Sequence, residues 1–378
     1  MDKILFVIPD FKIGGTNKSL TSLIAKLKDK AKMSVLSLTE FGDLKKDFSN
    51  VEILKANKLI NYWIADFNKM KFYNKVQAFP IKIIKNISKK LNCDLEKFVL
   101  KTGSKKFKHK FNIVIGYEEG LANRFATFIE SPYHISWIHC NPKFSNTDFK
   151  EFEETYLKSD KIICVSKSAQ VSFNEIYPKF SSKTDVIYNL INEEQIKQLS
   201  NEGVSISNII NDEDFLIISV GRICKVKQFV EIPKIACKIK DRNINFKWLI
   251  IGDGENEYVN EIKEEIKNYG LSDYILMTGY QENPYPFFKR ANLYVCTSLS
   301  ESCPMVFLEA NTLGTPVIST NFSSAKELIN PDFGTITNLE NMPIAIEDYI
   351  RGKSSSKEKE NKKEFENFNN LLRLLQLK

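Results

Sequence analysis

The residues best suited to chemistry in this sequence are carboxylates and cations that stand beside glycine and proline. Glu301 and Glu309 are separated by seven residues in SLSESCPMVFLEANTLGTP, where Pro304 is placed to start a helix and Gly314 to end it. A carboxylate inside an apolar helix such as MVFLEA is costly unless donors pair with it, and the two hydroxyls of a ribose would supply them. The alternative for both glutamates is structural, with each accepting from backbone N–H groups nearby.

Two cations follow a strand-like run upstream of these glutamates. The stretch SVGRICKVKQ places Gly221 and Arg222 at the end of an expected strand, with Lys225 and Lys227 just after it. A guanidinium and an ammonium that reach one spot suit a diphosphate, whose charge must be neutralised when it departs as a leaving group. An ordinary basic loop is the alternative, and for Lys225 it is the preferred interpretation.

Glycine-rich turns follow two other expected strands. GGTNKSL begins at Gly14 and Gly15 and opens a helix, so bare backbone and free helical N–H groups meet there, and IIGDGE contains Gly252. A simple tight turn is the alternative for both. Glu40 stands where NAD enzymes hold a ribose, but the glycines do not have the G-x-G-x-x-G spacing, which disfavours that interpretation.

His139 stands at the end of an expected strand, in SWIHC. A lone histidine there is either a satisfied core residue or part of a site. Neither a D-x-D in a metal-binding context nor a His/Cys cluster is present, so the sequence predicts no metal. The seven cysteines contain no C-x-x-C pair, which is typical of reduced thiols.

Short apolar runs alternate with helical patterns and would position all of these residues. Such alternation predicts an α/β fold with parallel, doubly wound sheets, and two sets of five or six strands predict two domains. Expected strands of the first half are 3–9, 33–38, 112–115, 134–138, 161–165 and 185–188. Those of the second half are 215–220, 246–251, 274–278, 292–297 and 316–320.

Length and composition fit this organisation. The chain has 378 residues, of which 43% are hydrophobic, enough for two domains with cores and too many for a disordered chain. No apolar run approaches the ~20 residues that span a bilayer, and MDKILFVIPD turns polar too early for a signal peptide. These features predict a cytoplasmic protein. The polar stretch 200–213 is the best linker, and 351–364 is the one low-complexity segment.

The two halves together resemble the GT4-type retaining glycosyltransferases, which have the GT-B fold of two Rossmann-like domains facing across a cleft. The resemblance is strongest over 214–330, where Glu301 and Glu309 fit the family's E-x7-E element, and it is weaker over 1–20 and 134–192. It implies an acceptor-side domain 1–190, a donor-binding domain 191–364, and a last helix 365–378 that crosses back to the first domain.

The resemblance also implies roles for individual residues. Arg222 and Lys227 would hold the donor diphosphate, Glu309 the ribose, and Glu301 would lie near the transferred sugar, which His139 would contact. The implied catalytic residues are His139, Glu301, Arg222 and Lys227. The implied donor-binding residues are Gly14, Gly15, Gly221, Arg222, Lys227, Gly252, Glu301, Ser302, Cys303, Pro304, Met305 and Glu309.

The activity implied is transfer of a hexosyl group from a nucleotide-diphospho-sugar, a UDP-sugar above all, to a glycan or lipid-linked acceptor. Configuration would be retained, no metal would be required, and the setting would be cell-surface polysaccharide synthesis. Many family members have glycine after the first glutamate, where this chain has Ser302 and Cys303, so the sugar pocket is expected to differ in shape. Residues 40–110 match nothing in the family.

The unmatched region holds most of the chain's positive charge. Residues 1–190 carry 32 basic and 20 acidic side chains, and 13 lysines but only two acids lie within 69–110. In IKIIKNISKKL, isoleucines fall on one side of a helix, and Lys82, Lys85, Lys89 and Lys90 on the other. The pattern predicts a surface for an anionic membrane or the acceptor, with peripheral attachment to the inner face of the cell membrane. A solvated lysine face is the alternative; no nucleic-acid-binding signature is present.

Three other functions remain open on the sequence alone. A sugar-nucleotide 2-epimerase of the same fold would need further acidic residues and a histidine around the cleft. A non-catalytic basic protein that binds membrane or nucleic acid would leave the strand-end residues of the second half unexplained. An NAD oxidoreductase is disfavoured by the glycine spacing.

Overall fold

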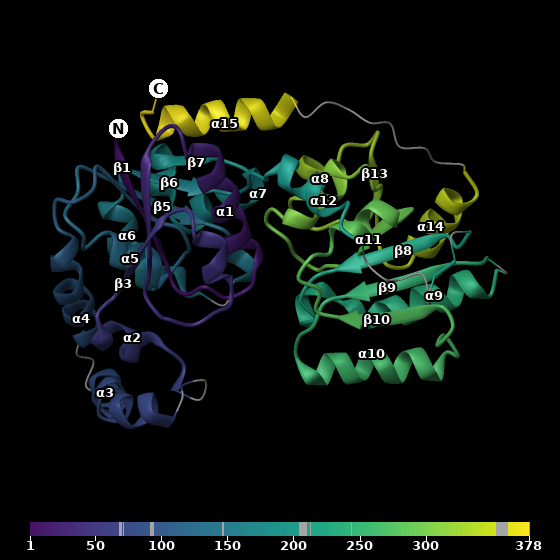
Figure 1. Cartoon of the computed structure of the whole chain (residues 1–378), viewed down its shortest axis with the longest axis horizontal. Helices are drawn as coiled ribbons and strands as arrows, with labels where there is room; N and C mark the ends of the chain where they lie inside the picture. Colours follow the sequence, from purple (N-terminus) through teal and green to yellow (C-terminus); the bar gives the residue numbers. More distant parts are fainter. Residues whose placement is uncertain are drawn as a thin grey trace. The chain divides into compact units, whose positions relative to one another are not determined.

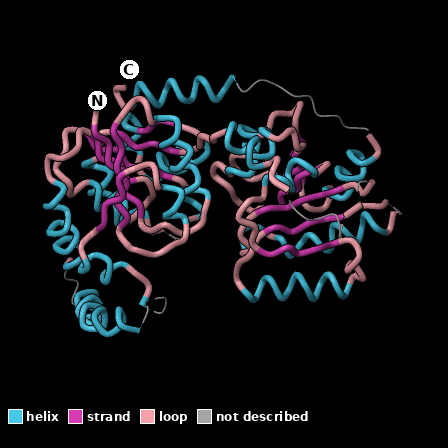
Figure 2. Tube along the Cα trace, in the orientation of Figure 1, coloured by secondary structure: helices cyan, strands magenta, loops and turns pink. Residues whose placement is uncertain are grey.

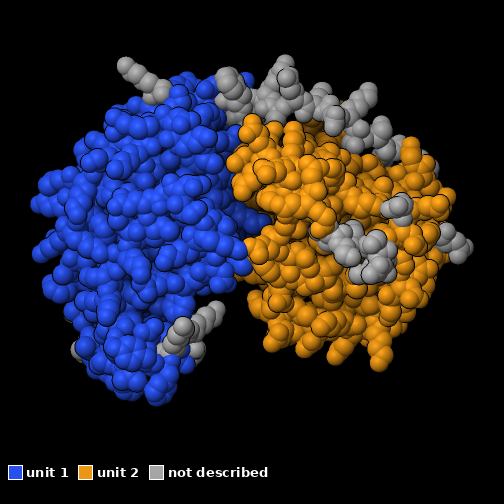
Figure 3. Space-filling model, viewed as in Figure 1, with its two compact units in different colours: residues 1–190, 362–378 blue, residues 191–361 orange. Residues whose placement is uncertain are grey.

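The chain divides into two compact units, coloured separately in Figure 3. A computed structural model describes residues 1–67, 70, 72–90, 94–145, 147–203, 210–211, 213–242, 244–352 and 362–377, without the side chains of residues 89 and 362–365. Unit 1 comprises Met1–Leu190 and Lys362–Lys378, and unit 2 comprises Ile191–Asn361. Parts of the expected linker 200–213 and of the segment 351–364 lie outside the described residues.

Unit 1 is built on a parallel sheet that, in the described part of the chain, has seven strands in the order β3-β2-β1-β4-β5-β6-β7. The central strands form because their runs are almost wholly apolar, as in KILFVI, and are buried on both faces. The strands are β1 (Lys3–Ile8), β2 (Lys32–Ser37), β3 (Glu52–Lys55), β4 (Ile113–Gly116), β5 (Tyr133–Ile138), β6 (Lys161–Cys164) and β7 (Thr184–Val186).

Helices cover both faces of this sheet (Figures 1 and 2). Leu5 and Val7 of β1 pack with Trp63 of α2 and Phe125 of α5, and a second cluster joins β6 to α7. The helices are α1 (Gly15–Leu27), α2 (Lys58–Ile64), α3 (Phe72–Lys90), α4 (Leu95–Ser104), α5 (Leu121–Ala126), α6 (Glu153–Lys158), α7 (Lys167–Ile176) and α15 (Lys362–Leu374). Short 3-10 helices are η1 (Leu44–Phe48), η3 (Lys105–Phe107), η4 (Pro142–Phe144), η5 (Phe149–Phe152) and η6 (Pro178–Lys183).

A side chain of the last helix, α15, hydrogen-bonds to the backbone of the rest of unit 1. Asn367 accepts from the backbone N–H of Tyr188 at 3.0 Å and donates to its carbonyl at 2.8 Å. The amide thus extends the backbone pairing just beyond β7, and Leu371 and Leu375 bury the apolar face of the helix.

Unit 2 has a parallel sheet of the same design, with six described strands in the order β10-β9-β8-β11-β12-β13. Trp248 and Ile250 of β9 pack on one face with Ile262 of α10, while Leu249 and Ile251 pack on the other. The strands are β8 (Leu216–Val220), β9 (Lys247–Ile251), β10 (Ile275–Gly279), β11 (Leu293–Cys296), β12 (Val317–Thr320) and β13 (Gly334–Thr337). The helices are α8 (Glu193–Leu199), η7 (Lys225–Lys227), η8 (Phe229–Glu231), α9 (Ile232–Lys240), α10 (Asn256–Asn268), α11 (Tyr285–Arg290), α12 (Met305–Thr312), α13 (Ala325–Leu328) and α14 (Met342–Ile350).

These two doubly wound sheets confirm the predicted fold class. The sequence analysis missed the edge strands β3 and β13, so the sheets have seven and six strands in place of five or six each. EILK and GTIT lack a continuous apolar run because an edge strand is covered less completely than a central one.

Each sheet reverses its strand order at one point, between β1 and β4 in unit 1 and between β8 and β11 in unit 2. Ligands of doubly wound sheets bind beyond the carboxyl ends of the strands at such a switch point. The loops that follow these four strands are therefore where a site is expected.

One surface expectation needs correction: Lys82 and Lys85 do not lie on an outward lysine face of α3. The ammonium of Lys82 donates to the carbonyls of Trp63 and Ala65 at 3.1 and 2.6 Å, and that of Lys85 to Trp63 at 2.8 Å. These carbonyls lie at the end of α2 and have no partner within it, so the two lysines cap that helix. Burial, with the nearby Lys85, lowers the pKa of Lys82 to about 8. Lys90 is exposed, and the side chain of Lys89 lies outside the described residues.

Candidate functional site

In unit 2 the loop after β8 is tied to the loop after β11, across the switch point. The hydroxyl of Thr297 donates to the carbonyl of Lys227 at 2.7 Å, and the N–H of Leu299 donates to the carbonyl of Val226 at 2.8 Å. Two loops 70 residues apart in the sequence are thereby held in one arrangement.

The same two loops bring Lys227 and Glu301 together as an ion pair. Ser298 also donates to the Glu301 carboxylate, at 2.8 Å, and the two charged side chains are only 20% and 14% exposed. Burial is the largest single effect and acts to lower the pKa of Lys227, but the charge and hydrogen bond of Glu301, together with Cys296 and Cys224, outweigh it, so the net effect is a raised pKa. Lys227 therefore carries its charge throughout the physiological pH range.

Glycines allow the backbones of the two neighbouring loops to approach each other closely. A Cβ on Gly252, whose φ is +145°, would lie 1.9 Å from the carbonyl oxygen of Gly221. A Cβ on Gly221 would lie 3.7 Å from the Lys227 ammonium. The loops after β8 and β9 can pack in this way only with glycine at position 252, and a Cβ on Gly221 would be in contact with the side chains of Lys227 and Phe229.

Arg222 and Lys225 follow β8 but are exposed. Within the part of the chain that the structure describes, the guanidinium of Arg222 makes no hydrogen bond or ion pair. The structure thus joins Lys227 to Glu301 and does not fix Arg222 against either of them. The guanidinium is available to an incoming anion.

Glu309 lies buried in α12, only 2% exposed, and accepts a hydrogen bond from the hydroxyl of Tyr285 at 3.3 Å. Pro304 precedes the first turn of this helix, which begins at Met305. Pro304, Met305 and Cys303 are buried and Ser302 is half-buried. Tyr285 was not anticipated, because its position in YPFFKR is that of a core aromatic.

In unit 1, Gly14 and Gly15 follow β1 and open α1 as predicted, and side chains fix the loop before them. The amide of Asn17 donates to the carbonyls of Asp10 and Lys12 at 3.0 and 2.8 Å, and Asp10 forms an ion pair with Lys12. No atom of the described chain lies within 4 Å of where a Cβ on Gly14 would be, so the approach to this backbone is open.

His139 lies directly after β5, and its surroundings keep it neutral. Its backbone N–H donates to Glu119 at 2.8 Å, its ring lies 4.6 Å from that of Tyr117 between centroids, and buried Nε2 has no hydrogen-bond partner among the described residues. Burial lowers the pKa of His139 to about 3. The ring can therefore exchange a hydrogen bond with a ligand but does not offer positive charge.

Glu118 and Glu119 stand in the segment 117–120 that follows β4, to which the sequence analysis assigned no role. Burial, then the neighbouring charges of Glu119 and Asp10, raises the pKa of Glu118 to about 8. The signal available was their position, because residues 117–120 stand at a strand end beside the switch point.

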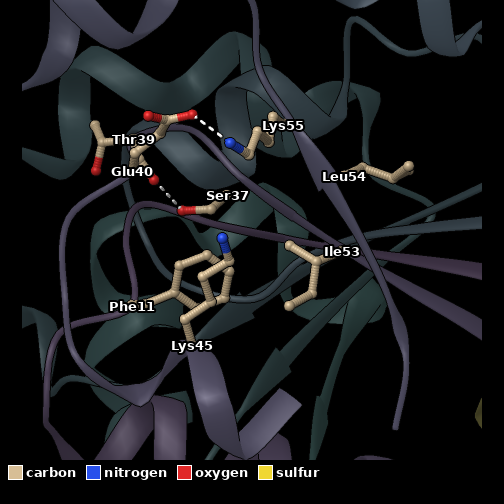
Figure 4. A pocket seen from close by; sticks show the side chains of 8 residues that line it. All are labelled: Phe11, Ser37, Thr39, Glu40, Lys45, Ile53, Leu54 and Lys55. Atoms are coloured by element: carbon tan, nitrogen blue, oxygen red, sulfur yellow. Dashed lines mark hydrogen bonds and ion pairs between the residues drawn. The ribbon is translucent and has the colours of Figure 1, made fainter. Parts of the chain in front are cut away.

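Glu40 lines a small pocket beside β2 and β3 (Figure 4). Its carboxylate forms an ion pair with Lys55 at 2.8 Å, and both side chains are largely exposed.

Neither a metal-ion cluster nor a membrane-spanning helix is present in the described ranges. They contain no group of three or more His, Cys, Asp or Glu side chains placed to hold a metal ion. Their helices include none that combines the length and the apolar character of a membrane span.

Comparisons with known proteins show a family resemblance in the second part of the chain. Residues 203–365 match the family model of glycosyl transferases group 1. The chain is 27% identical over 222 residues to an uncharacterized glycosyltransferase of Methanocaldococcus jannaschii, covering 56% of this chain and 54% of that one. It is 27% identical over 188 residues to the Campylobacter jejuni N-acetylgalactosamine-N,N'-diacetylbacillosaminyl-diphospho-undecaprenol 4-alpha-N-acetylgalactosaminyltransferase, covering 49% and 48%. The chain spans about half the length of these curated relatives.

Solved structures match over nearly the whole chain. Anabaena HepE in complex with UDP and glucose superposes with a TM-score of 0.70 at 17% identity, over 92% of this chain and 90% of that one. TarM matches with a TM-score of 0.67 at 12% identity, over 93% and 91%. Residues 203–365 therefore resemble the family of glycosyl transferases group 1, within a chain that has the GT-B fold.

Proposed function

We propose that this chain is a retaining glycosyltransferase that moves a hexosyl group from a UDP-sugar to a glycan or lipid-linked acceptor in cell-surface polysaccharide synthesis. The observation that carries the proposal is the buried Lys227–Glu301 pair at the switch point of the unit that matches the family. The solved relatives in complex with UDP and UDP-glucose support the choice of donor.

The diphosphate of the donor is assigned to the end of β8. Lys227 brings a fixed positive charge beside the backbone of Gly221, and Arg222 brings a guanidinium with no protein partner in the described structure. The backbone N–H groups of Gly221 and Gly252 already donate to the carbonyls of Ile251 and Gly279, so the two cations carry the assignment of the anion site. Gly252 allows the neighbouring loop to approach closely.

Glu309 is assigned to the ribose. Its buried carboxylate has four acceptor sites, and the hydrogen bond from Tyr285 uses one of them. Vicinal hydroxyls would supply two further donors in charge-assisted hydrogen bonds. Residues between the two glutamates shape the sugar pocket in this proposal. They are Ser302, Cys303, Pro304 and Met305.

In the proposed reaction the bond between the anomeric carbon and the diphosphate oxygen breaks, and the acceptor oxygen forms its bond on the same face. The departing phosphate oxygen takes the proton of the acceptor hydroxyl. Arg222 and Lys227 stabilise the charge that grows on the diphosphate, so positioning and electrostatics supply the rate enhancement. Their two positive charges perform the neutralisation, and the proposal requires no metal.

Unit 1 contributes a neutral hydrogen-bonding group in this proposal. His139 contacts a hydroxyl of the transferred sugar through Nε2, which has no partner among the described residues. Gly14 and Gly15 offer open backbone to the donor phosphates at the start of α1.

The names of several relatives support a lipid-linked acceptor. The Campylobacter jejuni relative and an Escherichia coli galactosyltransferase, 25% identical over 198 residues, are both named for diphospho-undecaprenol acceptors. The localisation proposed is cytoplasmic, with peripheral attachment to the inner face of the membrane.

A panel of UDP-, GDP- and ADP-sugars tests the activity. We expect the protein to release a nucleoside diphosphate from a UDP-sugar, faster with a lipid-linked acceptor, and the new linkage to keep the donor's anomeric configuration by NMR. Conversion of the donor to its 2-epimer without transfer would favour the epimerase, and an inverted product would contradict retention.

A further inference from the structure

The buried carboxylate of Glu309 has a hydrogen-bond donor in place beside it. The hydroxyl of Tyr285 donates to it across 3.3 Å, although the two residues are 24 positions apart in the sequence. Tyr285 is the first residue of α11, and Glu309 belongs to α12. Within the residues that the structure describes, this carboxylate has no other hydrogen bond and no ion pair. One neutral hydroxyl leaves most of the acceptor sites of a carboxylate unused.

Packing fixes the ring that carries this hydroxyl. Tyr285 is half-buried against a small apolar cluster, which consists of Ile191, Ile196 and Met305. The cluster joins the first residue of unit 2 to α8 and α12, and the helices α8, α11 and α12 lie side by side (Figure 1). The hydroxyl of Tyr285 therefore approaches Glu309 from one fixed direction.

The backbone that carries Tyr285 is also held, through the side chain of Asn283. The carboxamide oxygen of Asn283 accepts from the backbone N–H of Tyr285 at 3.2 Å. Its amide nitrogen donates to the carbonyl of Leu199 and to the carboxylate of Glu202, both at 2.9 Å. Asn283 thus joins the start of α11 to the end of α8. A tyrosine held by its ring and by its backbone loses little further freedom when a ligand binds.

We propose that Tyr285 is a positioning residue for the donor nucleotide, whose hydroxyl orients the Glu309 carboxylate toward the vicinal hydroxyls of the ribose. The last torsion angle of a glutamate has a broad energy minimum, and the hydrogen bond from Tyr285 narrows it. Tyr285 acts through Glu309 and thereby strengthens the preference for a ribonucleotide over a 2′-deoxyribonucleotide. The inference rests on the proposed function, because it takes Glu309 as the group that binds the ribose.

The Tyr285→Phe variant tests this role, because it removes the hydroxyl and keeps the ring that packs against α8 and α12. Isothermal titration calorimetry measures the binding of UDP and of 2′-deoxy-UDP to the parent and to the variant. We expect the parent to bind UDP at least about tenfold more tightly than 2′-deoxy-UDP, since the lost hydrogen bond is to a charged group. In Tyr285→Phe this preference should fall at least about threefold, because the members of one hydrogen-bond network are coupled.

Two further readouts separate positioning from a merely structural role. A loosened fold would weaken the binding of both nucleotides equally, and its effect would add to that of Glu309→Ala. If Tyr285 acts through Glu309, adding Tyr285→Phe to Glu309→Ala should change UDP affinity by less than about twofold. In turnover assays, Tyr285→Phe should raise KM for the UDP-sugar more than it lowers kcat, because the ribose contact is the same before and during transfer.

Tyr274→Phe is the matched control. Tyr274 is half-buried directly before β10, at the end of the strand opposite to the site, and its ring centroid lies 5.3 Å from that of Phe246. This variant should keep the parental affinity and the parental preference for UDP. If Tyr285→Phe keeps that preference while Glu309→Ala loses it, the role of Tyr285 is overturned and the proposed donor stands. A parent that binds no nucleoside diphosphate would overturn the proposed function, and this inference with it.

Discussion

Replacing Lys227 by methionine should destabilise unit 2, because it leaves Glu301 partly buried without its cation. Breaking a buried ion pair by removing one partner costs about 3–5 kcal/mol, and the residual exposure of 20% and 14% places this pair at the lower end, about 3 kcal/mol. For a unit of this size that corresponds to a fall of roughly 6–12 °C in Tm.

The matched control is Lys225→Met, two positions earlier in the same 3-10 helix and exposed. Differential scanning calorimetry at pH 7 should show the large shift for Lys227→Met and almost none for the control. Adding Glu301→Gln to Lys227→Met should recover part of the loss, since the uncompensated charge is then removed. Equal shifts for the two lysine variants would refute the paired arrangement.

The pH dependence of this pair has a definite sign. Because the folded-state pKa of Lys227 is raised above its ordinary value of 10.5, its contribution to stability is fully present below pH 10.5 and is lost above it. The Tm difference between the parent and Lys227→Met should therefore be constant between pH 6 and 9, because this whole interval lies below pH 10.5. In turnover assays, Lys227→Ala should lower kcat more than donor affinity, because diphosphate charge grows in the transition state.

Three further variants test other parts of the structure. Gly252→Ala should lower the free energy of unfolding by at least about 2 kcal/mol, because its Cβ would meet backbone at 1.9 Å. Gly279→Ala, where φ is +72° and the space is open, should lower it by about 1 kcal/mol, and urea unfolding compares the two variants. Lys82→Gln with Lys85→Gln should lower stability by about 1–2 kcal/mol through the lost cap of α2, and urea unfolding measures that loss. The pKa of Glu118 is raised in the folded state, so the parent loses stability as the pH rises from 4.5 to about 8. Glu118→Gln has no such loss, and its Tm relative to the parent should therefore rise across the same pH window in thermal melts.

The sheets could be predicted from the sequence because their central strands are buried on both faces. That burial requires near-continuous apolar runs such as FLIISV, which leave a plain signal. The edge strands β3 and β13 are less completely buried, and their sequences contain no such apolar run. The same logic located the candidate site, since residues such as Arg222 and His139 stand where apolar strands end.

Side-chain partners were harder to predict than strand ends. The pairing of Lys227 with Glu301 depends on two loops that only the strand order β8-β11 makes adjacent. The partners of Lys82 and Lys85 in α3 were missed for a related reason. Periodicity separates isoleucines from lysines, but it does not show that the carbonyls at the end of α2 lie within reach of these two lysines.

The measurement that tests the central claim most directly is the binding of UDP to the parent and to Glu309→Ala. The rise in Tm that the ligand causes reports the binding. At 100 times its dissociation constant the nucleotide should stabilise the parent by about 2.7 kcal/mol. Glu309→Ala should lose most of this stabilisation, while Glu257→Ala on the exposed side of α10 should keep it. Parental UDP affinity in Glu309→Ala, or stabilisation of the parent by NAD and by no nucleoside diphosphate, would contradict the assignment of this site to a nucleotide-sugar donor.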